Sequence, residues 1–570
     1  MRRLKEMYPD ELVVIGVHSA KFPSERLTEN IRQFVMRHGI DHPVVNDAGM
    51  RIWSDYAVRA WPTLVLIDPR GRIAGQRSGE ILAEDFAQII EEVIQQNPSA
   101  VDRSPITLQP EARLQPERPL RYPAKLLLAG DRLFIADSGH HRILEARLDP
   151  DGLGGELLRV IGSGEAALRD GSLETAAFNH PHGMALRGSP DSGTLYVADT
   201  GNHAVRAVDL EEGVVRTAAG TGQKAHGRYL LGAPTETPLR SPWAVLLLEG
   251  ILMIAMAGSH QVWALVDEGS QEQLGIFAGN GVEDLVDGPI AQSSFNQPSD
   301  LAYGLGHLFV ADPEASAVRA ISLIEQARTM TLVGQGLFEF GDQDGETVTA
   351  LLQHPMGIDF SDGLIYVADT YNHKIKVLDP VAGQVKTLIG SGQAGDRDGP
   401  FDAAQLFEPE GLQVYNGKVY IADANNHLIR AADLQAGQVH TFRLRGLDRL
   451  PGPAPVEQAQ RIEPLQVAPG QVRLVLDVRL PEGYERSPDS PAVVRLGDGS
   501  PVYSFAPGEA IAWMVDVRES RSLPVEVTLY YCQAHDARLC LIHDQKLVIP
   551  LEVSQDGPPE ARIAYTVPAF

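Results

Sequence analysis

Residues 364–376 are Leu-Ile-Tyr-Val-Ala-Asp-Thr-Tyr-Asn-His-Lys-Ile-Lys, and the chain is organised around this stretch and its echoes. The pattern predicts a strand at 364–368, a polar turn at 369–372 and a second strand from His373. Variants of the stretch recur five times, with Asp137, Asp199, Met256, Asp312 and Asp423 at the position of Asp369. A nearly fixed spacing of this kind is typical of a repeat architecture, in which each unit is one supersecondary element.

Each unit accommodates four short strands. In the fifth unit these are 357–360, 364–368, 374–378 and 385–389, separated by turns rich in Gly, Asp and Asn. Such spacing predicts an antiparallel meander. Six meanders are expected to close radially as a β-propeller at 121–446, because closure protects most strand edges. The motif resembles NHL repeats, and this resemblance implies six blades.

The repeated turn aspartates have a structural interpretation. A carboxylate in a turn accepts hydrogen bonds from backbone N–H groups of its own turn. Catalysis rarely needs the same residue in every repeat, so we assign a structural role to the whole set. This set comprises Asp137, Asp199, Asp312, Asp369 and Asp423.

Composition limits the classes of function. A chain of 570 residues is long enough for several domains, and its 44% hydrophobic content is typical of globular proteins. The net charge of −26 argues against nucleic acid or an anionic membrane as a partner. No run is long and apolar enough to span a bilayer, and Met1 to Pro9 does not resemble a signal peptide. Two cysteines do not form a secreted disulfide scaffold, so we expect a cytoplasmic protein.

The N-terminal segment, residues 1–98, alternates strands with helices. Strands are predicted at 12–18, 43–47, 61–68 and 72–75, and helices at 28–39, 49–58 and 83–96. This order predicts an α/β domain. With Trp61-Pro62-Thr63 opening a strand, it resembles the thioredoxin fold of the TlpA and alkyl hydroperoxide reductase/thiol-specific antioxidant families. The resemblance implies a cis peptide bond between Trp61 and Pro62, opposite a redox Cys-x-x-Cys.

The redox cysteines of those families have no counterpart in this segment. The chain begins inside the helix that carries them in the families, and its first cysteine is Cys532. Either the module is redox-inactive, or a strand and a Cys-x-x-Cys lie upstream of Met1. The first strand of such a sheet lies between the strands at 12–18 and 63–67. We therefore expect a truncated module in which these two strands flank a gap.

Linkers at 99–120 and 447–460 flank the propeller, and a β-sandwich is expected at 461–556, followed by a tail at 557–570. Residues 472–480 alternate apolar and other side chains with period two, as a strand with one buried face does. Tyr530-Tyr-Cys532 and Leu539-Cys540 resemble the N-terminal domain of DsbD-type thiol:disulfide interchange proteins. The resemblance implies a redox pair, Cys532 and Cys540, on neighbouring strands; two unrelated core thiols are the alternative.

The repeats also predict a candidate binding surface. Each innermost strand follows a proline, and the next residue is expected to ring the mouth of the central channel. Unlike its neighbours, this residue differs from blade to blade, and broken symmetry marks a position where function acts. We therefore predict a protein partner on this face, bound through His182, Trp243, Ser299, Met356 and Glu410. His182 and Glu410 are too few to hold a metal, so neither a metal nor another cofactor is expected.

The blade-to-blade loops share this face, which we call the crossover face. Their carboxylates are either ordinary solvated groups or part of the binding surface; they are Glu283, Asp284, Asp287, Asp342, Asp344, Asp396 and Asp398. Asp342-x-Asp344-Gly and Asp396-x-Asp398-Gly hint at calcium, but the later ligands of a full calcium loop are missing.

Taken together, the three parts resemble the NHL repeat-containing protein 2 family. The resemblance rests on residues 11–22, residues 59–68 and the repeats. It implies a protein-binding scaffold joined to a thioredoxin-like module that is linked to cellular redox homeostasis. The alternative is a thiol-disulfide oxidoreductase or peroxide reductase whose redox cysteines lie upstream. A hydrolase or lyase with a metal in the channel is disfavoured by the poor ligand set, and no catalytic residue is assigned.

Overall fold

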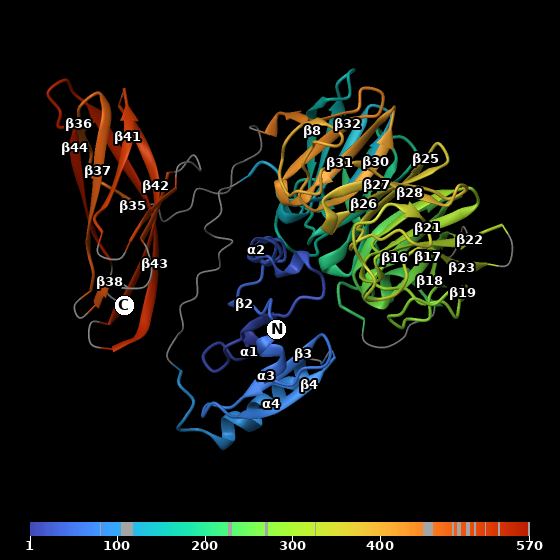
Figure 1. Ribbon diagram of the computed structural model, residues 1–570, viewed down its shortest axis with the longest axis horizontal. Helices are drawn as coiled ribbons and strands as arrows, with labels where there is room; N and C mark the ends of the chain where they lie inside the picture. Colours follow the sequence, from blue (N-terminus) through green and yellow to red (C-terminus); the bar gives the residue numbers. More distant parts are fainter. Residues whose placement is uncertain are drawn as a thin grey trace. The chain divides into compact units, whose positions relative to one another are not determined.

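The structure is a computed structural model (Figure 1). It describes residues 1–79, 81, 83–103, 118–225, 231–267, 272–324, 327–447, 460–481, 484–486, 492–496, 502–506, 509–518, 520–533 and 536–567. The chain divides into two compact units, one formed by Met1–Glu117 and Pro451–Phe570 and the other by Arg118–Leu450.

The second unit is built from six five-stranded sheets. Blade 1 contains β5 (Pro123–Ala129), β6 (Arg132–Asp137), β7 (Arg142–Leu148), β8 (Gly154–Ile161) and β34 (Arg443–Arg445); blade 2 contains β9 (Gly171–Ser172), β10 (Pro181–Arg187), β11 (Thr194–Asp199), β12 (Ala204–Asp209) and β13 (Val214–Ala219). Blade 3 contains β14 (Leu231–Gly232), β15 (Pro242–Leu248), β16 (Ile251–Met256), β17 (Gln261–Asp267) and β18 (Glu272–Ala278); blade 4 contains β19 (Gly288–Pro289), β20 (Asp300–Gly304), β21 (His307–Asp312), β22 (Ala317–Ser322) and β23 (Arg328–Val333). Blade 5 contains β24 (Gly345–Glu346), β25 (Gly357–Ser361), β26 (Leu364–Asp369), β27 (Lys374–Asp379) and β28 (Gln384–Ile389); blade 6 contains β29 (Gly399–Pro400), β30 (Pro409–Tyr415), β31 (Lys418–Asp423), β32 (Leu428–Asp433) and β33 (Gln438–Thr441).

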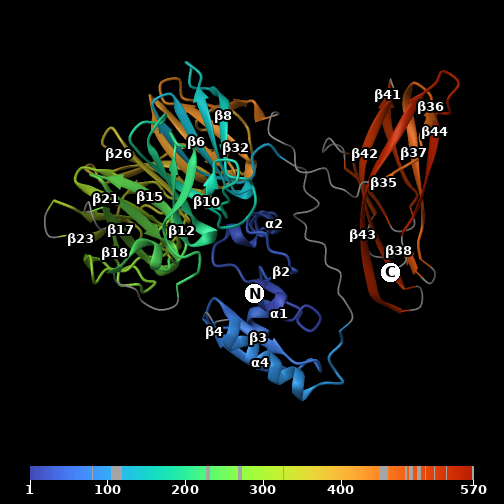
Figure 2. The same ribbon diagram turned by 180° about the vertical axis from the view of Figure 1, so that it is seen from behind.

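The blades form a closed ring. Each innermost strand contacts the innermost strand of the next blade, in the order β5, β10, β15, β20, β25 and β30, and β30 contacts β5 again. Figure 2 shows the same ring from behind. Closure is made by β34, which follows blade 6 in sequence but pairs in parallel with β8 of blade 1. The expected six-bladed propeller is therefore present, with a C-terminal strand that completes the N-terminal blade.

Each blade has one strand more than the meander predicts. In blades 2 to 6 a two-residue strand from the incoming loop pairs with the outermost strand, as β24 does with β28. Four of these short strands begin at the Gly of an Asp-Gly pair, where φ lies between +137° and +153° at Gly171, Gly288, Gly345 and Gly399. Glycine adopts such angles without strain, which explains the repeated Asp-Gly.

The N-terminal segment alternates helices with short strands. Its elements are α1 (Arg2–Met7), β1 (Gly16–His18), η1 (Ser24–Arg26), α2 (Thr28–Arg37), β2 (Val44–Asn46), α3 (Arg51–Asp55), β3 (Thr63–Ile67), β4 (Ile73–Ser78) and α4 (Ala83–Gln96). Leu4 of α1, Leu66 of β3 and Ile90 of α4 belong to one hydrophobic cluster. The strands, however, do not form one sheet: β1 pairs only with β2 in parallel, and β3 only with β4, among the residues that the structure describes.

The C-terminal segment consists of two sheets with a common core. One sheet contains β35 (Gln460–Arg461), β36 (Leu465–Val467), β38 (Tyr484–Arg486), β39 (Ala492–Leu496), β40 (Val502–Phe505), β42 (Arg521–Gln533) and β43 (Asp536–Val553). The other contains β37 (Gly470–Arg479), β41 (Ile511–Val517) and β44 (Glu560–Thr566). Leu474 and Trp513 of the smaller sheet pack with Val527 and Ile549 of the larger one, so the two sheets form a sandwich.

The prediction that residues 557–570 form a tail was wrong. Residues 560–566 form β44, which pairs in parallel with β37 from Arg473 to Arg479. Ala561, Ile563 and Tyr565 point into the sandwich core, with exposed fractions of 7% or less. This short alternating run follows Gly557-Pro-Pro, and the turn residues concealed its strand character.

Candidate functional site

The structure brings three of the predicted mouth residues together. His182 Nε2 lies 3.2 Å from Glu410 Oε1, although their strands belong to blades 2 and 6. The imidazole also stacks on the indole of Trp243 from blade 3, with ring centroids 5.6 Å apart and planes 1° from parallel. Blade 1 lies between His182 and Glu410 in the ring and presents only the methyl group of Ala124 at this position. A small residue in blade 1 thus allows a contact between blades 2 and 6.

The other two predicted residues are buried. Ser299 Oγ donates a hydrogen bond to the carbonyl oxygen of Met356 at 3.1 Å. Both side chains are at most 5% exposed, and Glu410 is 3% exposed. Of the five predicted residues, therefore, only His182 and Trp243 are partly exposed at the mouth.

Two charged residues that sequence reasoning missed join opposite blades, one residue further along the innermost strands. Lys125 of blade 1 reaches Asp300 of blade 4, and the ammonium lies 2.9 Å from Oδ2. The same ammonium donates to the carbonyl oxygens of Met356 and Glu410. A lysine has three protons to donate, and these three acceptors use them all. The buried charge is thus fully hydrogen-bonded.

A signal for Lys125 and Asp300 was present in the repeats. Both stand one residue after the predicted mouth position, where the other four blades have Gly or Ala. The small residues have a steric reason, since a Cβ at Gly411 would lie 2.5 Å from the carbonyl oxygen of Ala124. A long charged side chain at such a position must extend into the channel. Comparing this second position across the blades would have revealed the pair.

A further carboxyl group comes from the innermost strand of blade 5. Asp359 of β25 accepts a hydrogen bond from the backbone N–H of Val414 in the next blade, at 2.7 Å. Burial, together with the nearby charge of Asp300, raises the pKa of Asp359 to about 6. Asp300 Oδ2 likewise accepts from Ile358 N at 3.0 Å, so channel side chains satisfy backbone donors on neighbouring inner strands.

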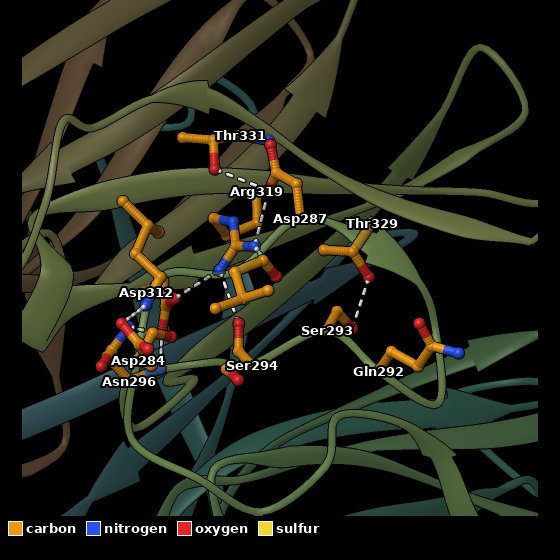
Figure 3. Close-up of polar contacts among 12 residues, drawn as sticks. Asp284, Asp287, Gln292, Ser293, Ser294, Asn296, Asp312, Arg319, Thr329 and Thr331 are labelled. Carbon is orange, nitrogen blue, oxygen red and sulfur yellow. Dashed lines mark hydrogen bonds and ion pairs between the residues drawn. The ribbon is translucent and has the colours of Figure 1, made fainter.

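The turn aspartates are buried and act between segments of a blade. In blade 4, Asp312 accepts from the N–H of Asn296 at 2.5 Å, which precedes the innermost strand. It also binds Arg319, whose guanidinium is held on its other side by Asp287 at 2.8 Å, as Figure 3 shows. The expectation that each Asp accepts from backbone N–H groups of its own turn was therefore wrong. The donors are the loop before the innermost strand and a buried cation, together with the side-chain amide of the turn Asn in blades 2, 5 and 6, namely Asn202, Asn372 and Asn426.

The same arrangement recurs in other blades. The buried cations Arg206, Arg430 and Lys376 occupy the place of Arg319. The loop aspartates that hold them are Asp170, Asp398 and, for Lys376, both Asp342 and Asp344. Each cation therefore bridges a buried turn Asp and an exposed loop Asp.

Some of the loop carboxylates are structural, because they hold the buried cations. These are Asp287, Asp342, Asp344 and Asp398. Lys374 and Lys376 occupy the position where the Asp342-x-Asp344 motif hinted at calcium. Within the described part of the chain, no group of three or more His, Cys, Asp or Glu side chains is placed to hold a metal.

Blade 3 replaces the ionic bridge by an apolar one. Met256 stands at the turn Asp position and Trp263 at the cation position, and they are 0% and 4% exposed. Both belong to one hydrophobic cluster, and the indole N–H donates to Gln261 Oε1 at 3.0 Å. The two substitutions go together, because a charge left alone in this place would be buried without a partner.

The repeated turn histidines join neighbouring blades. His141, His203, His373 and His427 each accept, at Nδ1, a backbone N–H from the residue before the proline of the next blade. In blade 4, Ser316 Oγ accepts the equivalent N–H. Burial lowers the pKa of His203 and of His373 to about 4, so both rings stay neutral and able to accept at neutral pH.

The residues predicted outside the propeller are placed as follows. The Trp61–Pro62 peptide bond is cis, and Trp61 is 47% exposed with its indole N–H donating to Ser19 O at 2.9 Å. Cys532 of β42 is paired in register with Cys540 of β43. The side chains of the two cysteines lie outside the described residues.

Comparisons with known proteins identify the family. The model of the NHL repeat matches residues 352–378. NHL repeat-containing protein 2 of Gallus gallus is 37% identical over 549 residues, which covers 86% of this chain and 74% of that protein. This chain belongs to the NHL repeat-containing protein 2 family. The matched residues include one of the recurring turns described above, from Asp369 to His373.

Two further relatives extend the comparison. The protein SUPPRESSOR OF QUENCHING 1, chloroplastic, of Arabidopsis thaliana is 34% identical over 616 residues, which covers 99% of this chain and 56% of that protein. This member of the NHL repeat-containing protein 2 family thus spans about half of the Arabidopsis protein. The thiol-disulfide oxidoreductase ResA of Halalkalibacterium halodurans is 32% identical over 93 residues, which covers 16% of this chain and 51% of ResA. None of the described helices is long and apolar enough to cross a membrane.

Proposed function

We propose that this chain is a protein-binding scaffold whose NHL propeller docks a protein partner at the channel mouth. The single observation that carries the proposal is the broken symmetry of that mouth. The blades supply Ala124, His182, Trp243, Ser299, Met356 and Glu410 at equivalent positions. Contacts inside the ring also break the symmetry, as Lys125 and Asp300 do, but His182 and Trp243 are both unlike the other blades and partly exposed, as contacts for a partner without six-fold symmetry need to be.

Trp243 is the proposed anchor. It is a partly exposed tryptophan, and its stacking on His182 restricts the indole before any partner arrives. Large aromatic side chains that are held in place supply much of the binding energy at protein interfaces. Cytoplasm is the proposed compartment. Neither nucleic acid nor a membrane is proposed as a partner, because the net charge is −26.

The test compares capture of partner proteins by the immobilised full chain and by two variants. Trp243→Ala should lose the specifically captured proteins. Tyr303→Ala is the matched control, since Tyr303 is a 42% exposed aromatic residue at the other end of an innermost strand, β20. Equal recovery by Trp243→Ala and the unaltered chain would refute the proposed surface.

The N-terminal segment is proposed to be a thioredoxin-like module linked to cellular redox homeostasis. The similarity of 93 residues of this chain to part of ResA supports this. It also supports the alternative function, a thiol-disulfide oxidoreductase or peroxide reductase whose cysteines lie upstream of Met1. Insulin reduction separates the two: this chain carrying Cys532→Ser and Cys540→Ser should be inactive, because no other cysteine is present. Activity only in a chain extended upstream would favour the alternative.

A further inference from the structure

The loop that leads into blade 5 is longer than its counterparts. In blades 2, 4 and 6 the Asp of the Asp-Gly pair stands eight positions after the first glycine of Gly-x-Gly: Asp170 after Gly162, Asp287 after Gly279 and Asp398 after Gly390. In blade 5, Asp344 stands ten positions after Gly334, and the longer loop carries Phe338, whose side chain is 65% exposed. The three shorter loops contain no aromatic residue. The fold therefore does not require an exposed ring at this place.

A second aromatic residue of blade 5 stands in the turn after β26. Tyr371 occupies the position that is glycine in blades 1 to 3, where a Cβ would meet another atom at 2.6–2.8 Å; these glycines are Gly139, Gly201 and Gly258. Tyr371 is partly exposed, and its ring stacks on the imidazole of His354, with centroids 4.3 Å apart and planes 10° from parallel. Since three blades form the turn with glycine here, the turn does not need a tyrosine.

A hydrogen bond fastens the longer loop to this turn. Asn372, the neighbour of Tyr371, donates from Nδ2 to the carbonyl oxygen of Gly341 at 2.8 Å. Gly341 lies in the longer loop, three residues after Phe338. The two segments are therefore held together on the crossover face. We call Phe338, Tyr371 and His354 the blade-5 patch.

The carboxylates at the blade-5 patch give it a negative charge. Glu339 is exposed next to Phe338 and accepts the N–H of that residue at 3.3 Å. Glu314 Oε1 lies 3.5 Å from His354 Nδ1. Both lysines of β27 are already bound by Asp342. Aromatic rings and carboxylates together are the groups that bind an ammonium or a guanidinium ion in proteins.

We propose that the blade-5 patch is a second docking surface, which binds a segment of a protein partner that carries apolar side chains next to Lys or Arg. Phe338 contacts the apolar side chains, and Glu339 and Glu314 pair with the cations. Exposed aromatic residues are typical of protein interfaces, and the complementary charge selects a basic segment. The net charge of −26 attracts the same segment over a longer range. None of the residues predicted at the channel mouth belongs to this patch, so binding here does not depend on Trp243.

The test measures the binding of a defined peptide to the purified full chain. The probe is a fluorescein-labelled peptide of alternating leucine and arginine, and its fluorescence anisotropy at physiological salt gives the dissociation constant. Phe338→Ser should weaken binding about fivefold or more, because an aromatic anchor is lost while the net charge stays the same. Tyr303→Ser is the matched control, since it removes a 42% exposed aromatic ring elsewhere, and it should bind as the unaltered chain does.

Two further measurements locate the peptide on the propeller. Glu339→Gln should weaken binding and reduce its dependence on salt, because one opposite charge is lost. A peptide that carries photo-leucine should crosslink to residues 335–341 or 369–373. Crosslinks confined to other residues would overturn the patch. Equal affinity of Phe338→Ser and the unaltered chain, or equally tight binding of a peptide of alternating leucine and glutamate, would also overturn it.

Trp243→Ala separates this proposal from the binding surface at the channel mouth. This variant should bind the peptide as tightly as the unaltered chain. Weaker binding by Trp243→Ala, together with unchanged binding by Phe338→Ser, would place the basic segment at the mouth and overturn the patch. Capture of partner proteins that survives Trp243→Ala would refute the mouth alone, so the two proposals fail separately.

Discussion

Lys125 and Asp300 meet across the central channel, although they belong to blades 1 and 4 on opposite sides of the ring. The ammonium and the carboxylate are 2.9 Å apart, and their side chains are 5% and 14% exposed. A residue of the first blade is thereby fastened to a strand that begins 175 residues later. The pair ties the ring together from the inside.

Replacing this lysine should destabilise the propeller strongly. Lys125→Met removes the ammonium and leaves the Asp300 carboxylate buried without its cation, which costs about 3–5 kcal/mol. Chemical denaturation of the full chain should show this loss in the free energy of unfolding. The double variant Lys125→Met, Asp300→Leu should recover part of it, since no charge is left alone. A stability of Lys125→Met equal to that of the unaltered chain would contradict the bridging role.

The ionic bridge of blade 4 should be exchangeable for the apolar pair of blade 3. Asp312→Met alone removes the buried carboxylate from Arg319, which keeps the exposed Asp287 and two backbone carbonyl oxygens, and we expect it to cost about 3 kcal/mol. Adding Arg319→Trp reproduces the Met256 and Trp263 arrangement and should restore much of the stability. Thermal unfolding measures both. Asp284→Met is the control. This residue is exposed and lies in the loop that also carries Asp287, so the substitution should change the stability little.

A double variant Asp312→Met, Arg319→Trp that is less stable than Asp312→Met would contradict this prediction. It would mean that the residues packed around the two positions determine whether a blade can hold an ionic or an apolar pair. The two substitutions are in direct contact, so their effects are not expected to add.

The turn histidines should make the propeller sensitive to acid. Burial lowers the pKa of His373 from 6.5 to about 4, and the neutral ring accepts the N–H of Glu408 at 3.2 Å. Between these two pKa values the unfolded chain binds more protons than the folded chain. The free energy of unfolding therefore falls as the pH is lowered through this range.

The substitution His373→Ser isolates this effect. A serine keeps an oxygen acceptor, as Ser316 does in blade 4, but does not titrate. We expect the difference in stability between pH 7 and pH 4 to become smaller by about 2 kcal/mol. Denaturation at several pH values checks this, with His440→Ser in β33 as the control. An unchanged pH dependence would show that the burial of His373 does not make the stability depend on pH.

The N-terminal segment should be the least protected part of the chain in hydrogen exchange. β1 is three residues long and, among the described residues, is paired only with β2, whereas the propeller strand β6 has partners on both sides. An unpaired strand edge leaves backbone groups open to water. We expect residues 12–18 to exchange faster than β6. Equal protection would mean that β1 is held as firmly as a strand with two neighbours.

Cys532 and Cys540 should form an intramolecular disulfide on mild oxidation. They are paired in register on neighbouring antiparallel strands, where Cα atoms lie about 4.5–5.5 Å apart. A disulfide accepts Cα separations of about 4.4–6.8 Å. Mass spectrometry of the oxidised chain, with Cys540→Ser as the control, should detect the loss of two hydrogen atoms only in the unaltered chain. Two free thiols after oxidation would rule out the pair.

The propeller could be predicted from sequence because its information is local and repeated. A strand, an Asp-led turn and a second strand follow one another within about a dozen residues, and each repeat confirms the others. The mouth positions were found for the same reason, by comparing equivalent residues. His182 and Glu410 could be singled out in this way, but their contact depends on Ala124 in the blade between them.

The features that were missed depend on contacts between distant segments. The buried cations join turns to loops 25 to 37 residues away, as Arg319 does to Ser294 O and Arg206 to Arg169 O. The pairing of Lys125 with Asp300 exists only once the ring has closed. The additional edge strands are two residues long, which is too short for any periodicity to appear.

The closing strand has a consequence for synthesis of the chain on the ribosome. β34 ends at Arg445, whereas the sheet that it completes begins at Pro123. The ring cannot close until the sixth blade and this strand have emerged, which takes on the order of tens of seconds at typical rates of translation. During that interval the nascent chain exposes the uncovered sides of its first and latest blades. Ribosome-associated chaperones have their longest opportunity to bind this protein before residue 445 appears.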